Sequence, residues 1–235
     1  KTGLLRIAGI MLLLLGLGAV AALALASRLD DAAAQQAQDR LTAELQQASV
    51  TPSTLPAILE DDPRIAAASP RPTVTTPDDD AAASGTSTTV PLPAIVAESS
   101  PSPGEAVGRI LIPSIGLDWV IIEGVTPDDL AQGPGHMPGT PLPGQPGNAV
   151  VSGHRTTYGA PFADLDLLEP GARISVETRI GTHTYEVAEV VVVAPDALWV
   201  TGQGPGAWLT HTTCHQKGSS QERLIVFARL NTGPN

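Results

Sequence analysis

One cysteine, one histidine and one arginine in the C-terminal half of the chain have side chains that could form a nucleophilic site. Cys214 is the only cysteine of the 235 residues, so it can form no disulfide within the chain. Arg223 follows it by nine positions, and His154 precedes it by sixty. A thiol that a fold can place beside a histidine and a guanidinium is a candidate nucleophile. The alternative for a lone cysteine is a small buried side chain without reactivity.

Alternation along a strand predicted at 207–214 sets the surroundings of Cys214. One face carries Thr210, Thr212 and Cys214, and the other carries Leu209, His211 and Thr213. The thiol therefore shares its face with hydroxyls. Arg223 opens the next strand, where a guanidinium would lie at a barrel rim, and His154 follows an earlier strand in a loop. Taken singly, Arg223 could be a surface charge and His154 a hydrogen-bonded loop histidine.

Short strands separated by turn-rich segments predict an all-β head. The expected strands are 109–113, 117–123, 147–153, 173–180, 182–193, 207–214 and 223–230. Only short helices are expected, near 127–131 and 162–168. This pattern favours a closed or nearly closed β-barrel. The glycine-rich stretches 133–139 and 202–206 are interpreted as turns, because neither precedes a substantial helix and neither has a P-loop lysine.

The N-terminal segment has the composition of a membrane span. Residues 7–26 are uncharged and would span about 30 Å as a helix, which matches a bilayer core. Lys1 and Arg6 precede this run, so the positive-inside rule places the N-terminus in the cytoplasm and the rest of the chain outside. The alternative is a cleavable signal peptide, since Ala24-Leu25-Ala26 offers small residues for cleavage.

Composition divides the chain into three predicted parts. Residues 1–28 form a transmembrane signal-anchor, and residues 29–106 form a stalk followed by a disordered linker rich in proline, alanine and aspartate. Residues 107–235 form the folded head. The net charge of −11 and the absence of a basic patch in the sequence argue against nucleic-acid binding.

A metal centre is not expected. His211 and His215 would share one face of a strand while Cys214 points to the other, so the three cannot converge on zinc. The acids that could bind calcium are scattered along the sequence. Two of them, Asp128 and Asp129, are typical of a helix N-terminus. No cofactor is expected either.

Three segments together resemble the catalytic segments of sortases, the membrane-anchored cysteine transpeptidases of Gram-positive bacteria. They are TTC at 212–214, RLIVFARL from Arg223 and GHRTTYGAPF from Gly153. The resemblance covers roughly 107–230. The HRTTYGAPF stretch, GPGH at 133–136 and the long acidic linker are most similar to the actinobacterial class E group.

The resemblance implies an eight-stranded β-barrel whose groove binds a sorting signal of the LPxTG or LAxTG type. Cys214 would attack the carbonyl between threonine and glycine, and a neighbouring imidazolium and guanidinium would favour its thiolate. His154 would be the general acid and base, and Arg223 would stabilise the oxyanion. An amine of a cell-wall precursor would resolve the thioester. Substrate binding is assigned to Thr212, Thr213, Met137 and Tyr158.

Two residues depart from the family's pattern. His211 stands on the predicted core face where the family usually has an apolar residue, so either the barrel is open there or His211 is hydrogen-bonded. Met137 stands where class E relatives tend to have a tyrosine, which leaves the LAxTG preference open. Two alternatives therefore remain: a sortase that polymerises pilins through a pilin lysine, and a catalytically silent surface domain that binds peptides.

Overall fold

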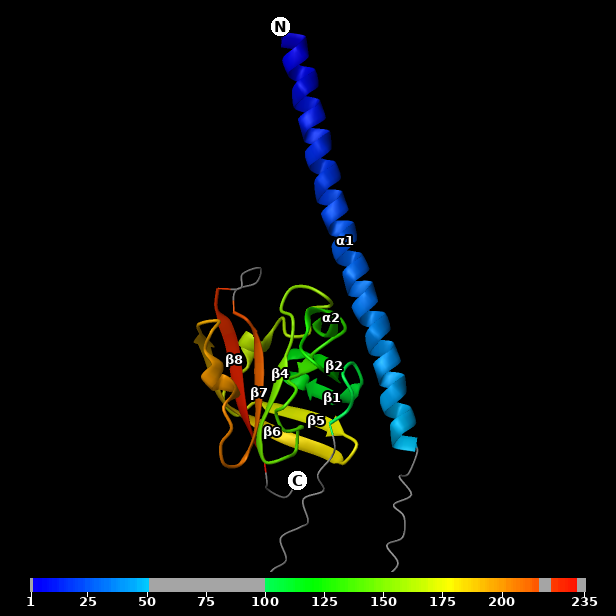
Figure 1. Cartoon of the computed structure of the whole chain (residues 1–235). Helices are drawn as coiled ribbons and strands as arrows, with labels where there is room; N and C mark the ends of the chain where they lie inside the picture. Colours follow the sequence, from blue (N-terminus) through cyan, green and yellow to red (C-terminus); the bar gives the residue numbers. More distant parts are fainter. Residues whose placement is uncertain (1, 51–99, 216–220, 232–235) are drawn as a thin grey trace, which may run out of the picture. The chain divides into compact units, whose positions relative to one another are not determined.

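A closed barrel of eight strands makes up the C-terminal half of the chain (Figure 1). The computed structural model describes residues 2–50, 100–215 and 221–231; most of the predicted linker, 51–99, lies outside the described residues. The strands are β1 (Ala106–Ile112), β2 (Leu117–Glu123), β3 (Gly135–His136), β4 (Gly147–Ser152), β5 (Arg173–Thr178), β6 (Gly181–Val193), β7 (Ala207–Cys214) and β8 (Arg223–Leu230). Their order around the barrel is β1-β2-β3-β4-β7-β8-β6-β5. The all-β barrel expected from the sequence is confirmed.

Alternating apolar residues fill the barrel. Side chains from facing strands, including Ile110, Val151, Tyr185, Leu209 and Val226, are fully buried in one cluster. Such alternation lets each strand bury one face while its other face meets solvent or a loop. The interior is therefore a packed core, and any substrate site must lie on the outer face or at the rim.

A parallel pair of strands brings distant parts of the sequence to one end of the barrel. β4 and β7 run parallel, with Ser152 opposite Thr212. Parallel strands need a long crossover connection, and here it carries β5 and β6. Because the two strands end at the same level, the residues that follow Ser152 emerge beside the end of β7.

The two-residue strand β3 was missed by the sequence interpretation, which assigned turns to 133–139. Gly135 and His136 pair with β2 on one side and with β4 on the other. The buried His136 ring is held by Glu123, with 2.7 Å between Nδ1 and Oε2, and its Nε2 lies 3.0 Å from the Pro141 carbonyl oxygen. β3 is thus fixed by long-range contacts rather than by a local strand pattern.

The short helices agree in place with the expectation. α2 (Pro127–Leu130) begins with a capping box in which Thr126 and Asp129 exchange hydrogen bonds, as expected for acids at a helix N-terminus. The 3₁₀ helix η3 (Leu165–Leu167) falls within the second predicted segment. Two further 3₁₀ turns, η2 (Pro113–Ile115) and η4 (Leu198–Thr201), lie in connections between strands.

The N-terminal segment forms one helix, α1 (Thr2–Val50). It is the one helix among the described residues that is long and apolar enough to cross a membrane. Its leucines are exposed, Leu12 by 72% and Leu13 by 75%, as expected for side chains whose surroundings are lipid. Both interpretations made from the sequence, an anchor and a cleavable signal, require such a helix.

Candidate active site

Cys214 and Arg223 face each other across the end of a strand pair. Cys214 is the last residue of β7 and Arg223 the first of β8, and they are register partners. The distance from Arg223 Nη1 to Cys214 Sγ is 3.9 Å, and both residues are half-buried. A permanent positive charge at this distance stabilises negative charge that develops beside it during a reaction. The antiparallel pairing of two strands thus places the guanidinium that the sequence predicted.

The loop that carries His154 is tied to the same strand. The Gly153 amide donates to the Thr212 carbonyl at 3.1 Å, and the Thr213 hydroxyl donates to the Gly153 carbonyl at 2.8 Å. His154 therefore leaves the end of β4 next to the last residues of β7. Glycine is needed at 153, because a Cβ there would lie 2.7 Å from the Phe162 ring.

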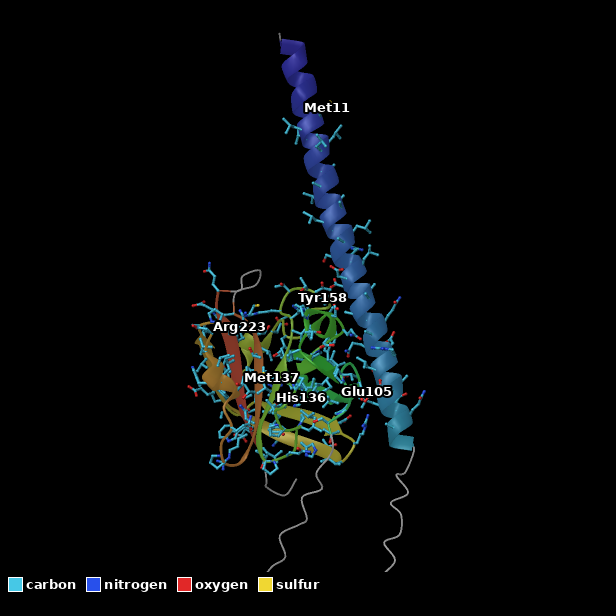
Figure 2. All side chains as sticks on the ribbon, viewed as in Figure 1. Met11, Glu105, His136, Met137, Tyr158 and Arg223 are labelled. Atoms are coloured by element: carbon cyan, nitrogen blue, oxygen red, sulfur yellow. The ribbon has the colours of Figure 1, made fainter. Side chains whose placement is uncertain are left out.

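The His154 imidazole is half-buried and packs against Tyr158, with 5.0 Å between the ring centroids. Burial lowers the pKa of His154, because desolvation disfavours the charged ring. The neutral imidazole is therefore the favoured form near pH 7. The imidazolium expected from the sequence is a minority species in the free protein, and Arg223 supplies the permanent charge near the thiol. Figure 2 shows Arg223 and Tyr158 toward the same end of the barrel.

Arg155 is a site residue that the sequence interpretation missed. Its buried guanidinium donates to the carbonyl oxygens of Cys214 and His215 and, through Nε, to that of Ala163 at 3.3 Å. It also pairs with Asp166 at 2.7 Å. One side chain thereby joins the loop of His154 to the end of β7. Its position directly after His154 was the available signal, but contacts to main-chain carbonyls cannot be read from a sequence.

The other predicted substrate-binding residues lie in different surroundings. Thr212 is half-exposed on the outer face of β7, whereas Thr213 is buried and its hydroxyl bonds Gly153. Met137 follows β3, and its amide donates to the carbonyl of Val150. Val150 pairs with Thr210, so Met137 lies level with the middle of β7 rather than with its end. Figure 2 accordingly shows Met137 nearer the middle of the barrel than Arg223. Their binding roles stay predictions.

His211 lies on the core face of β7, as predicted. The sequence predicted either an open barrel at this position or a hydrogen-bonded ring, and the part of the chain that the structure describes shows neither. The side chain is fully buried, and neither ring nitrogen has a hydrogen-bond partner among the described residues. The ring instead meets Phe162 edge-on, with 5.5 Å between centroids. Burial lowers the pKa of His211 to about 3, so the ring is neutral at physiological pH.

A surface cavity of about 720 Å³ opens farther along the outer face of β7. Trp199, Trp208 and Phe227 contribute to its wall, and the rings of Trp199 and Phe227 stack at 5.9 Å. The loop before β7 is fastened to β4 by Asn148, whose Nδ2 donates to the carbonyls of Val200 at 3.1 Å and Gly202 at 3.2 Å. Trp208 at this cavity and Cys214 are six residues apart on β7, and Thr210 between them is buried.

The chain is similar to proteins of one known family. The family model for the sortase domain matches residues 110–231. Sortase D of Bacillus subtilis is 32% identical over 140 residues, which are 58% of this chain and 69% of that protein. Sortase SrtE1 of Streptomyces coelicolor is 32% identical over 144 residues, which are 54% of this chain and 41% of that protein.

Solved structures agree with the sequence relatives. A Clostridium perfringens Sortase D5 transpeptidase superposes with a TM-score of 0.52 and 34% identity, over 55% of this chain and 81% of that one. Sortase C-1 of Actinomyces oris gives a TM-score of 0.52 and 32% identity, over 55% and 76%. With a matching family model, matching relatives and a barrel of the same fold, the chain belongs to the sortase family of cysteine transpeptidases.

Proposed function

We propose that Cys214 is the acyl-carrying nucleophile for a sorting signal of the LPxTG or LAxTG type. Its Sγ bonds to the carbonyl carbon of the signal's threonine, and the bond from that carbon to the glycine nitrogen breaks. The proton of the thiol passes through His154 to the departing amine. The incoming amine then displaces the thiol, which recovers a proton through His154, and a new amide bond replaces the old one.

The observation that carries this proposal is the 3.9 Å approach of Arg223 to the thiol from the facing strand. The same guanidinium is close enough to receive the oxyanion that develops when Sγ adds to a carbonyl. Such preorganised donors contribute about 3–4 kcal/mol to catalysis. The neutral His154 fits direct transfer of the thiol proton to the imidazole in the substrate complex.

The outer face of β7 supports an extended peptide as the substrate. Cys214, Thr212 and Trp208 lie on one face of β7 and are half-exposed, while Thr210 between them is buried against Asn148. An extended chain covers the distance from Cys214 to Trp208 in about six residues. A signal whose threonine lies at Cys214 would place its leucine, and the residues before it, toward the aromatic cavity.

The proposed setting is the outer surface of a bacterial cell membrane, with α1 as the anchor and the N-terminus in the cytoplasm. The exposed leucines of α1 support the anchor. The proposed partners are surface proteins that bear a sorting signal, and the acceptor is an amine of a cell-wall precursor or a pilin lysine. A class E assignment is part of the same proposal.

A transpeptidation assay tests the reaction. The full chain in detergent is given LPxTG and LAxTG peptides with triglycine as acceptor, and the amide product is followed by mass spectrometry. We expect transfer of at least one peptide, loss of all transfer in Cys214→Ala, and a 100- to 1000-fold lower kcat in Arg223→Ala. Cleavage of neither peptide, or an active Cys214→Ala, would support the silent peptide-binding alternative instead.

A further inference from the structure

The carboxamide of Gln38 in α1 takes the place of a missing strand at the edge of β2. Val120 donates its amide to Gln38 Oε1 at 2.7 Å, and Gln38 Nε2 donates to the Val120 carbonyl at 3.1 Å. β3 pairs with β2 only at Ile122 and Glu123, so it does not reach Val120. An unpaired strand edge exposes main-chain groups that need partners. Gln38 supplies both partners from one side chain.

An apolar stripe of α1 packs beside the two hydrogen bonds between Gln38 and Val120. Ala34 and Leu41 are fully buried, and Leu41 joins a cluster with Ala106, Val120 and Ile122. Positions 34, 38, 41 and 45 recur at helical spacing and lie on one face of the helix. Polar contacts flank the stripe: Arg40 donates to Gln132 Oε1 at 2.6 Å, and the Ala106 amide donates to Glu44 at 3.1 Å. The outer half of α1 is therefore built to dock on β1 and β2.

α1 also contacts the loop that carries His154. The Gly159 amide donates to Asp31 Oδ1 at 2.9 Å. Gly159 lies in a strained stretch in which Tyr158 and Ala160, both non-glycine residues, have φ of 53° and 48°. Tyr158 in turn packs on the His154 ring. The hydrogen bond that Asp31 accepts thus fixes the backbone next to Tyr158, whose ring packs against His154.

The order of these contacts along α1 sets which end of the barrel lies near the apolar run. Asp31 is five residues beyond Ala26, the last residue of that run, and Glu44 is eighteen residues beyond it. At 1.5 Å per residue these contacts lie about 7.5 Å and about 27 Å along the helix from the run. The loop that carries His154, residues 153–160, is called the catalytic loop below. It is therefore bound to the segment of α1 that immediately follows the apolar run.

We propose that residues 31–45 of α1 are a docked strut of the catalytic domain, which holds the catalytic loop at a fixed, short height above the membrane. The strut completes the edge of β2 through Gln38 and supports the strained loop through Asp31. This inference rests on the proposed membrane anchoring, and the height experiment does not depend on catalysis.

Docking is tested by amide exchange in the full chain, reconstituted in nanodiscs of phosphatidylglycerol and phosphatidylethanolamine. Gln38→Ala should raise the hydrogen exchange rate of the Val120 amide tenfold or more, because that amide loses its acceptor. Gln36→Ala, at an exposed position of the same helix, is the matched control and should change it less than twofold. Equal exchange in the two variants would overturn the docked strut.

Height is tested with a fluorophore on the catalytic loop. Thr156→Cys in a Cys214→Ala background gives one labelling site, and lipids with an acceptor dye on the headgroup report its distance from the membrane. Seven residues of helix-forming sequence inserted between Arg28 and Leu29 should raise the loop by about 10 Å and lower the transfer efficiency measurably. The same seven residues inserted after Gly85 in the linker should leave it unchanged. If both insertions act alike, the strut does not set the height.

An activity readout separates this inference from the proposed reaction. With the native Cys214, the insertion at Arg28 should slow transfer to a triglycine-headed lipid in the same membrane at least tenfold, while transfer to free triglycine stays within twofold. A wild-type protein inactive toward both acceptors would count against the transpeptidase proposal. The exchange and fluorescence results would still decide the strut.

Discussion

The guanidinium of Arg155 donates to the main-chain carbonyl oxygen of Cys214, with 3.4 Å between Nη1 and that oxygen. The same group holds the next carbonyl, that of His215. Arg155 is the direct neighbour of His154 in sequence, so the loop of the proposed general base and the backbone of the proposed nucleophile share one anchor. We therefore expect the relative position of the His154 and Cys214 side chains to depend on Arg155, which holds the backbone of β7 through its carbonyls.

Replacement of Arg155 should lower kcat more than it changes KM. Arg155→Lys keeps a charge but offers no fork to bind several carbonyls at once, so we expect kcat to fall about tenfold, and Arg155→Ala should lower it about 100-fold with KM within threefold. The melting temperature is measured alongside, since lost hydrogen bonds cost about 1–3 kcal/mol.

Asp166→Asn is the control for Arg155, because it removes the more exposed partner of the pair and leaves the carbonyl contacts in place. Its kcat should stay within twofold of wild type. A stability loss in Arg155→Ala with no change in kcat would show a structural role alone and contradict the positioning role.

The buried imidazole of His211 should make the fold sensitive to acid. Its pKa is about 3 in the folded protein and near 6.5 in the unfolded chain. The unfolded state therefore binds the proton first, so the stability is complete above pH 6.5 and is lost as the pH falls toward 3. The His211 share of that loss at pH 4 is about 3 kcal/mol.

His211→Leu removes this proton-binding group and also two buried nitrogens without partners among the described residues. We expect the variant to be about 1–2 kcal/mol more stable at pH 7, and its stability should fall less steeply between pH 7 and pH 4. Urea unfolding at the two pH values measures both effects. Equal losses for variant and wild type would show that His211 does not titrate as its burial requires.

Seven of the eight strands could be predicted from the sequence because their alternation is local information. The catalytic roles of Cys214, His154 and Arg223 stay predictions. Alternation placed His211 on the core face and Arg223 at the start of a strand, whereas the pairing of Arg223 with Cys214 came from the structure. β3 could not be predicted, since Gly135 and His136 form a strand only through their partners in β2 and β4. Arg155 and Gln38 were missed for the same reason: their targets are main-chain groups brought near by the fold.

Asn148 should govern the loop beside the aromatic cavity. Its Nδ2 donates to two loop carbonyls, while its Oδ1 accepts from Thr210 at 2.7 Å. Asn148→Asp keeps the shape but sets a carboxylate oxygen against both carbonyls, so the loop should detach. We expect KM for the sorting peptide to rise about fivefold or more with kcat within twofold.

Thr210→Val is the comparison for Asn148, since it removes a single hydrogen bond and leaves the loop contacts intact. It should change KM less than twofold. Steady-state kinetics on both variants gives the answer, and a fall in kcat without a change in KM for Asn148→Asp would place the loop's influence on the chemistry rather than on binding.

Gly159 should tolerate no side chain, because any side chain there would suffer both backbone strain and a steric clash. Its φ is 74°, in the left-handed region, and a Cβ would lie 2.6 Å from Cη2 of Trp119. Gly159→Ala should destabilise the fold by about 2 kcal/mol and lower kcat, because the loop must shift and carry Tyr158 away from His154. A double-mutant cycle with Trp119→Leu separates the costs. In the double variant, the smaller side chain should recover the share of the stability loss that comes from the clash and leave the share that comes from the backbone. Full additivity of the two stability losses would show that Trp119 does not confine the loop.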